Sequence, residues 1–393
     1  MECEGQTARS LEPGEAGETV VMASYPRSGN TMLRKLIESA TGVLTGSDSR
    51  PDRTMARDLK LYGLEGEGDV GDHRDGGRVW VVKSHFPEKY GWKELGAQRA
   101  ILLVRNPFNA IRSYFNMLLT GTHTHSIIPS EYTRFADVWD SHVREEIGWW
   151  CEYHLWWLRQ PIPVLVVRYE ELVAARPQAR ERELRRIVDF LYGPTHTRRR
   201  MEAAGIGGDT DGLAAGVPRI EDTPREEVEA RLRTTLEKAA QGSRSVDTAY
   251  KPRSAAVSTD VSHFTEEQQT YVVETAASVL SELGYADLLH ADGLPLATPA
   301  EPTAPALSSQ GGLPECPLVW CNRGPPMRPQ TKEDPGARGF MWKWKLRKIV
   351  QVAAKPGSTE HQMAAAEAEV AAVSQEQVRL FEDDVVSKIS AQS

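Results

Sequence analysis

The chain has 393 residues, of which 40% are hydrophobic and 26% charged, and its formal net charge is −8. This length allows a large core and two domains, while the acidic balance excludes broad binding to nucleic acid, so any anion site must be a local basic pocket. The sequence has neither an apolar run of 18 residues nor a signal-peptide pattern, which predicts a cytoplasmic protein, and its four cysteines form no metal-ligand pattern, so no metal site is expected.

The first structural signal is an alternation of strand-like and helix-like segments after residues 1–17, which are predicted to form a disordered tail. Four short, continuously apolar runs are typical of buried parallel strands. These runs are TVVMAS (19–24), VWVVK (79–83), AILLVR (100–105) and VLVVR (164–168). The alternation predicts an α/β fold of three layers, P-loop-like, with a mainly parallel central sheet flanked by helices.

Helix-start signals support the same reading, and the composition changes near residue 290. Asn106 followed by Pro107 is a good N-cap and first-turn pair, and Thr265 with Gln268 forms a capping box. The globular domain is therefore predicted to span 18–290. The remainder comprises a Pro/Gly-rich linker (291–338), then a basic and aromatic patch with a C-terminal helix (339–393). The patch at 339–350 also suggests an alternative role in peripheral contact with an anionic membrane surface.

The loop between the first strand and the following helix, SYPRSGNT (24–31), resembles a phosphate-binding P-loop that lacks two of its usual residues. Asn30 stands where the P-loop has its Lys, and Ser24 stands at its first Gly. The backbone N–H groups can still wrap an anion at the positive end of the helix. Arg27 adds a charge with two donors, and Thr31 adds a hydroxyl.

Two further groups of polar residues follow buried strands. Lys83 and His85 lie at the end of the second run, and Arg105 closes the third, with Ser113 eight residues later. Open parallel sheets bind ligands at the carboxyl ends of their strands. His titrates near neutral pH and can remove a proton from an attacking hydroxyl, so His85 is the candidate general base.

The three motifs together resemble those of sulfotransferases that use 3′-phosphoadenosine 5′-phosphosulfate (PAPS). The family patterns Y-P-[KR]-S-G-[TN]-T, K-[ST]-H-x-P and R-[ND]-P-x-x-x-x-x-S match Tyr25–Thr31, Lys83–Pro87, and Arg105 with Ser113. The segment VLVVRYEEL (164–172) is similar to the next strand of the family. The WSC-domain type of sulfotransferase has a similar YPRSGNT loop, but this chain has no cysteine-rich WSC module.

The resemblance, which covers about residues 18–290, implies a role for each matched residue. The 5′-phosphosulfate would be held by Arg27, Ser28, Gly29, Asn30 and Thr31. The 3′-phosphate would be held by Arg105 and Ser113, with Lys251 and Arg253 as candidates in place of the family's late R-K-G-x-x-G-D-W-K segment, which this chain lacks. Catalysis would use His85 as the base, Lys83 near the reacting group and Arg27 against the leaving phosphate. Many family members have Lys at the position of Arg27, whose role here would be purely electrostatic.

Two other functions remain open at this stage. A P-loop kinase of the nucleotide-kinase kind shares the sheet and loop, although Asn30 replaces its Lys and no clear Walker-B Asp follows an apolar strand. A non-catalytic nucleotide-binding protein, with the C-terminal extension as an interaction module, is the other alternative. The acceptor of a sulfotransferase would be a hydroxyl on an alcohol, phenol, sugar or peptide, and the sequence does not distinguish these.

Overall fold

A computed structural model gives the fold of most of the predicted domain. It describes residues 8–12, 15, 17–48, 78–87, 96–120, 126–174, 176–193, 220–240 and 259–289. Lys251 and Arg253, the predicted linker at 291–338 and the predicted patch and helix at 339–393 lie outside the described residues. The predictions made for them therefore stay predictions.

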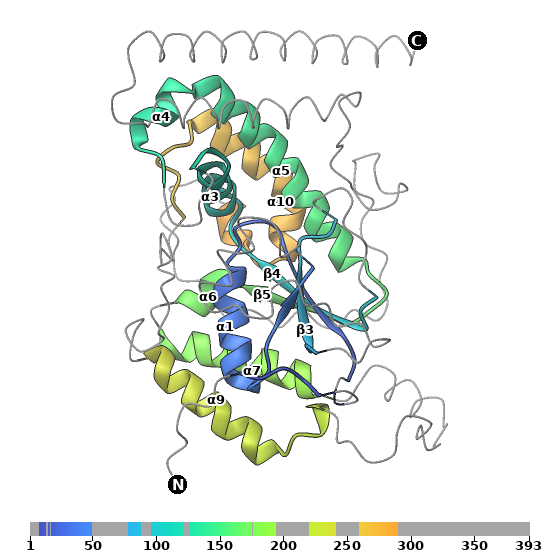
Figure 1. Ribbon diagram of the computed structural model, residues 1–393. Helices are drawn as coiled ribbons and strands as arrows, with labels where there is room; N and C mark the ends of the chain where they lie inside the picture. The colour runs from blue at the N-terminus through green and yellow to red at the C-terminus, as the bar shows by residue number, and fades with distance from the viewer. Residues whose placement is uncertain are drawn as a thin grey trace, which may run out of the picture.

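A sheet of five parallel strands forms the centre of the molecule, in the order β2-β3-β1-β4-β5 (Figure 1). The strands are β1 (Val20–Ser24), β2 (Gly46–Ser47), β3 (Val81–Ser84), β4 (Arg99–Val104) and β5 (Val164–Arg168). All four predicted strands are present. The two-residue strand β2 was not predicted, because Gly-Ser carries no apolar signal.

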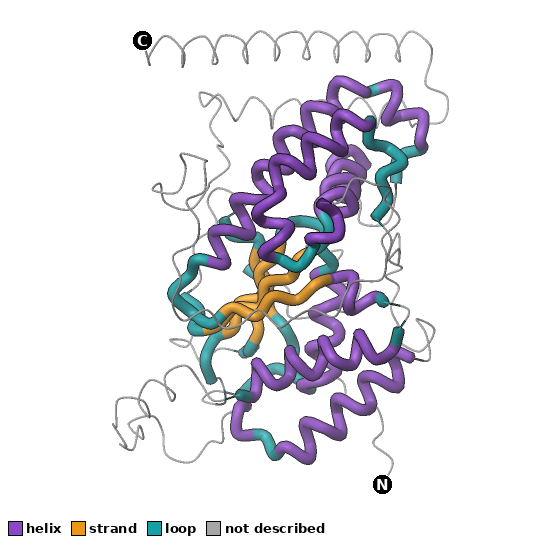
Figure 2. The backbone as a smooth tube through the Cα atoms, turned by 180° about the vertical axis from the view of Figure 1, so that it is seen from behind, coloured by secondary structure: helices purple, strands orange, loops and turns teal. Residues whose placement is uncertain are grey.

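Helices cover both faces of this sheet, as Figures 1 and 2 show. The helices are α1 (Asn30–Thr41), α3 (Pro107–Thr120), α4 (Pro129–Arg134), α5 (Ala136–Leu158), α6 (Tyr169–Val173), α7 (Pro177–Tyr192), α9 (Arg225–Ala240) and α10 (Glu266–Glu282), with 3-10 turns η2 (Ile220–Asp222) and η3 (Ala286–Leu289). Among the described residues, no helix is both long and apolar enough to cross a membrane.

Alternate residues of the buried strands divide the core into two clusters. Val21 and Ala23 of β1 pack with α3, α5 and α10, whereas Val20 and Met22 pack with α1, α7 and α9 on the other face. Successive side chains of a strand point to opposite faces, so an unbroken apolar run is what a sheet covered on both faces requires. The predicted three-layer α/β fold is confirmed.

The predicted helix-start signals act as caps in two places. Asn106 Oδ1 accepts from Phe108 N at 2.9 Å before α3, and Thr265 forms a reciprocal capping box with Gln268 at the start of α10. Each cap satisfies N–H groups that the first helical turn leaves without partners. These caps fix where α3 and α10 begin, and α3 carries Ser113.

The predicted disordered tail is wrong for residues 8–12, which pack against the domain. Arg9 N donates to Gly42 O at 3.0 Å, Leu44 N donates to Arg9 O at 2.8 Å, and Leu11 N donates to Arg78 O at 2.8 Å. The side chain of Leu11 is buried in the same core cluster as Val20. An apolar residue and backbone pairing hold this segment, and a reading based on the acidic composition of the whole tail missed them.

Candidate active site

The loop between β1 and α1 has a backbone suited to an anion. Arg27 has φ 69° and Gly29 has φ 106°, and Gly29 immediately precedes the first helical residue, Asn30. A left-handed residue before a helical one turns successive N–H groups toward one point, and no side chain caps this end of α1. The amides at the start of α1 are therefore available to a ligand.

Arg27 brings the residues predicted for the 5′ and 3′ ends of the ligand together. Its Nε donates to Ser113 Oγ of α3 at 3.2 Å, and its carbonyl oxygen accepts from Arg105 Nη1 at 2.9 Å. The left-handed backbone of Arg27 is strained for a residue with a side chain, and such strain is common at binding sites. Three residues from two separate sequence motifs thus form one basic, hydroxyl-bearing cluster.

Tyr169, which sequence reasoning did not assign, supports both parts of this cluster. Its ring centroid lies 4.5 Å from the Arg105 guanidinium carbon, and a Cβ added at Gly29 would lie 2.4 Å from a Tyr169 ring carbon. Position 29 therefore needs glycine for two reasons, its φ and this close ring. One feature of the sequence could have identified Tyr169. It directly follows β5, and parallel sheets bind ligands at the carboxyl ends of their strands.

Two buried polar atoms at the cluster have no partner among the described residues. These are Ser28 Oγ and Arg105 Nε, and both side chains are buried, Arg105 at 6% exposure. Buried donors are almost always hydrogen-bonded in native proteins, so an orphan pair beside a loop of aligned amides fits an absent anionic ligand. The donor set, with a guanidinium, hydroxyls and backbone amides, suits phosphate or sulfate oxygens.

His85 reaches this loop from the neighbouring strand. Its Nδ1 is 2.7 Å from Ser24 O, the last carbonyl of β1, and its Nε2 is 3.4 Å from Asn30 Nδ2. The parallel register of β1 with β3 sets this approach, since Ala23 pairs with Ser84 just before His85. Next to His85, Ser84 Oγ donates to Asp48 Oδ2 at 2.5 Å and accepts from Phe86 N at 2.9 Å, which braces the turn.

Lys83, predicted to lie near the reacting group, is a buried residue of β3. It lies in register with Met22 of β1 and Ser47 of β2, and it is 6% exposed. Thr31, predicted to contribute a hydroxyl, is the second residue of α1 and is half-buried. The structure thus places Lys83 and His85 on the strand next to the loop.

A buried network of polar side chains connects the loop to helix α5. Tyr25 OH donates to Glu146 Oε2 of α5 through a short contact, and Glu146 Oε1 is 3.8 Å from His142 Nδ1. All three side chains are fully buried. Sequence analysis missed Glu146, because α5 is read as an apolar, Trp-rich core helix and nothing local marks one carboxylate as the partner of Tyr25.

The segment that follows Arg105 is tied to the C-terminal part of the domain. Glu170 accepts from Asn106 N at 2.9 Å and from Tyr285 OH at 2.6 Å, and Asn106 Nδ2 donates to Thr259 Oγ1 at 2.5 Å. Burial, reinforced by the Glu170 carboxylate, raises the pKa of Tyr285 well above its ordinary value, so this hydroxyl stays a donor. These hydrogen bonds attach the residue after Arg105 to Glu170 and Thr259.

Two arginines of the helices beside the site have specific polar partners. Arg34 of α1 is 1% exposed and donates to the hydroxyl and carbonyl oxygens of Thr45, both at 2.8 Å. Arg112 of α3 forms a short ion pair with Asp260. Burial alone would raise the pKa of Asp260, but hydrogen bonds from Ser262 and the charge of Arg112 outweigh it and lower the pKa. The helical pattern alone does not reveal such partners.

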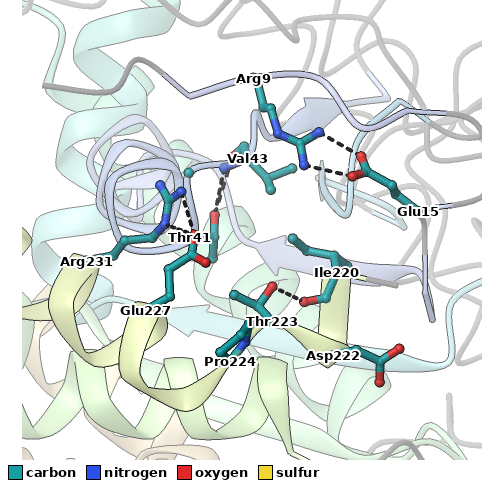
Figure 3. A pocket seen from close by; sticks show the side chains of 11 residues that line it. Arg9, Glu15, Thr41, Val43, Ile220, Asp222, Thr223, Pro224, Glu227 and Arg231 are labelled. Carbon is teal, nitrogen blue, oxygen red and sulfur yellow. Dashed lines mark hydrogen bonds and ion pairs between the residues drawn. The ribbon is translucent and has the colours of Figure 1, made fainter. Parts of the chain in front are cut away.

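A separate pocket of about 210 Å³ lies at the opposite end of α1, where Thr41 and Gly42 meet the start of α9 (Figure 3). Its two arginines are each paired with a carboxylate. Arg9 contacts Glu15 at 2.7 Å, and Arg231 contacts Glu227 at 2.9 Å. Figure 3 shows the two pairs on opposite sides of the pocket. Among the described residues, none of those predicted for the site lines it.

Comparisons with known proteins find similar sequences and a similar solved structure. A model described as "Sulfotransferase domain" matches residues 18–203. The WSCD family member CG9164 of Drosophila melanogaster is 37% identical over 175 residues, which is 44% of this chain and 50% of the relative. The WSCD family member AAEL009094 of Aedes aegypti is 34% identical over 181 residues, which is 46% of this chain and 52% of the relative. The chain thus spans about half the length of these curated relatives.

Among solved structures, the crystal structure of mouse sulfotransferase SULT7A1 complexed with PAP aligns with a TM-score of 0.37 at 15% identity, over 69% of this chain and 88% of that one. Residues 18–203, which the family model matches, contain the loop, His85 and Arg105. The resemblance inferred from the three motifs is therefore confirmed over residues 18–203, which match the sulfotransferase domain model.

Proposed function

We propose that this protein transfers a sulfuryl group from PAPS to a hydroxyl acceptor, with His85 as general base. The observation that carries the proposal is the cluster around Arg27. That residue contacts Ser113 through its side chain and Arg105 through its backbone, beside two buried polar atoms that have no partner in the described part of the chain. A ligand with anionic groups at both its 5′ and 3′ positions would satisfy this cluster.

In the proposed reaction, the acceptor oxygen attacks sulfur opposite the oxygen that bridges sulfur and the 5′-phosphate. The new bond joins the acceptor oxygen to sulfur, the sulfur–bridging oxygen bond breaks, and its electron pair leaves on the 5′-phosphate of adenosine 3′,5′-bisphosphate. The hydroxyl proton passes to His85 Nε2. Arg27 and the loop amides would stabilise the leaving phosphate. A sulfuryl group carries less negative charge than a γ-phosphate, so the Lys of the usual P-loop is less needed at Asn30.

Recognition of the 3′-phosphate is assigned to Arg105 and Ser113, with Lys251 and Arg253 as further proposed ligands. Arg253 precedes Thr259 by six residues, and Thr259 contacts the residue after Arg105. Six residues span at most about 20 Å, so this stretch of chain can reach the cluster. In this proposal all four residues bind the same group, the 3′-phosphate.

Calorimetric titration tests the proposal directly. The full chain should bind adenosine 3′,5′-bisphosphate far more tightly than AMP or ADP, and it should do so without Mg²⁺. Two charge-assisted hydrogen bonds of about 1.5–3 kcal/mol each correspond to a preference of about 10²–10⁴-fold. Equal affinity for AMP and the bisphosphate, or a need for Mg²⁺, would favour the kinase alternative instead.

The non-catalytic alternative makes a different prediction, which is bisphosphate binding without turnover on any alcohol, phenol, sugar or peptide hydroxyl. A panel of such acceptors with radiolabelled PAPS therefore tests activity and acceptor class together. The cytoplasmic location stays a prediction. So does membrane contact through residues 339–350, for which co-sedimentation with anionic liposomes should weaken when that segment is removed.

A further inference from the structure

Three groups from β1, α1 and β3 form a closed ring of hydrogen bonds beside the loop. Ser24 Oγ donates to Asn30 Oδ1 at 2.5 Å, Asn30 Nδ2 lies 3.4 Å from His85 Nε2, and His85 Nδ1 lies 2.7 Å from Ser24 O. Ser24 is fully buried, and the other two side chains are half-buried. The ring therefore joins the last residue of β1, the first of α1 and the residue after β3.

The backbone carbonyl fixes the direction of every bond in this ring. A carbonyl oxygen can only accept, so His85 Nδ1 must carry a hydrogen. In a neutral imidazole the other nitrogen, Nε2, then holds a lone pair and accepts from the amide –NH₂ of Asn30. That orientation turns Asn30 Oδ1 toward Ser24 Oγ, which donates its hydroxyl hydrogen. Each assignment follows from the one before it.

We infer that Asn30 and Ser24 are positioning residues that hold His85 with its lone pair on Nε2, on the side of the anion-binding loop. The inference deepens the proposed function, because it explains which nitrogen receives the proton. It also gives Asn30 a role that differs from the direct ligand contact predicted for it from the sequence. In histidines, the hydrogen bond made by one ring nitrogen commonly determines whether the other nitrogen carries a hydrogen.

The amide of Asn30 has a property that a Lys at the same position would lack. When Nε2 gains a proton, the amide can rotate, so that Oδ1 accepts from Nε2–H and Nδ2 donates to Ser24 Oγ. An ammonium group has no acceptor, and it would repel the imidazolium. A neutral group that can donate or accept is therefore compatible with His85 before and after proton transfer, and the P-loop Lys is not.

The test reads the hydrogen positions on His85 directly. Long-range ¹H–¹⁵N spectra of the full chain with ¹⁵N-labelled histidine distinguish protonated from bare ring nitrogens, and a His85→Gln sample identifies the His85 signals among the ten histidines. At pH 8 the wild type should show a protonated Nδ1 and a bare Nε2. In Asn30→Asp a carboxylate would face Nε2, so that nitrogen should become protonated at the same pH.

Activity of a neutral variant separates positioning from ligand binding. Asn30→Ala, which removes the partner of Nε2 without adding charge to the loop, should lower kcat by about 10–100-fold, as misplacement of a reacting group does, with bisphosphate affinity within about threefold of wild type. Asn30→Thr, which keeps a group able to donate and accept, should recover most of this loss. The charged residues close to His85 in the chain or on the adjoining segments, Lys83, Asp48 and Arg27, are the same in every variant.

A wild-type His85 with hydrogen on Nε2 alone, or an Asn30→Asp variant whose Nε2 stays bare, would overturn the inference. A different result would contradict the proposed function. If the spectra are as expected but no acceptor receives a sulfuryl group, the hydrogen-bonded ring is supported and the proposed reaction is wrong. Should Asn30→Asp not fold, Ser24→Ala replaces it. Ser24→Ala removes the hydroxyl that donates to Asn30 Oδ1, so the Asn30 amide should be able to rotate. The Nε2 signal of His85 should then broaden or shift, and an unchanged signal would count against the inference.

Discussion

The two ends of helix α1 each place two arginines beside a glycine with positive φ, but the partners that the structure describes for these arginines differ. At the N-terminal end, Arg105 donates to a backbone carbonyl and stacks on Tyr169, and its Nε has no partner among the described residues. At the C-terminal end, Arg9 and Arg231 are each neutralised by a glutamate around a pocket of about 210 Å³.

From this difference we propose that anion binding belongs to the N-terminal end of α1, where buried donors lack described partners, and not to the pocket at the C-terminal end. Helix dipoles act in the same sense, because the N-terminal end carries partial positive charge and the C-terminal end partial negative charge. A glutamate beside an arginine removes the attraction for an incoming anion, whereas a carbonyl and an aromatic ring leave most of it. The predictions below test this contrast, from the largest expected effect to the smallest.

The largest effect is expected for His85, at the N-terminal end. His85→Ala should reduce turnover by about 10²–10⁴-fold, the usual contribution of a general base, with bisphosphate affinity nearly unchanged. Glu227→Gln at the other end is the control and should keep wild-type turnover. Sulfuryl transfer from radiolabelled PAPS measures both variants, and full activity of His85→Ala would remove this residue from the mechanism.

The two arginine environments can be compared by ligand binding. Arg105→Ala should remove most of the preference for adenosine 3′,5′-bisphosphate over AMP, a loss of about 10²–10⁴-fold if two charge-assisted bonds disappear. Arg231→Ala should leave that preference within about twofold. Calorimetry with both nucleotides tests the pair, and unchanged AMP binding by Arg105→Ala serves as the folding control. Equal losses in the two variants would contradict the contrast.

The two glycines should differ in their effect on stability. Gly29→Ala combines a φ of 106° with a Cβ 2.4 Å from the buried Tyr169 ring, so it should lower the unfolding free energy by about 2–5 kcal/mol. Gly42→Ala, with φ 73°, meets only the flexible end of Arg231 and should lower it by about 1–2 kcal/mol. Urea denaturation measures both. A larger effect at Gly42 would mean that Tyr169 moves aside easily.

The smallest effect is expected for the exposed pair of Arg9 and Glu15. A hydrogen bond from Arg9 lowers the pKa of Glu15, so the pair stabilises the folded state at neutral pH, and this stabilisation is lost as the pH falls through the lowered folded-state pKa. Arg9 is 53% exposed, so Glu15→Gln should lower the unfolding free energy by less than about 1 kcal/mol. The difference from wild type should vanish in acid, and a difference that persists at pH 3 would exclude the ion pair as its cause.

The sequence alone determined the features that depend on neighbouring residues. Unbroken apolar runs identified four of the five strands, because a strand covered on both faces needs them. Asn106 and Thr265 marked helix starts, since a cap acts on N–H groups two or three residues away. The loop at 24–31 and the strand ends at Lys83, His85 and Arg105 were recognisable because their motifs are short and continuous.

The tertiary structure decided which of these residues meet. Arg27 contacts Ser113 86 positions away, Arg105 reaches Arg27 across 78, and His85 reaches Ser24 across 61. Those contacts follow from the strand order β2-β3-β1-β4-β5, which apolar runs do not encode. The packing of distant segments also explains other features that the sequence did not reveal. These are the burial of Arg34 and Glu146, the packing of Tyr169 on Gly29 and Arg105, and the attachment of residues 8–12. A residue's partner is set by how distant segments pack, whereas its local conformation is set by its neighbours in the chain.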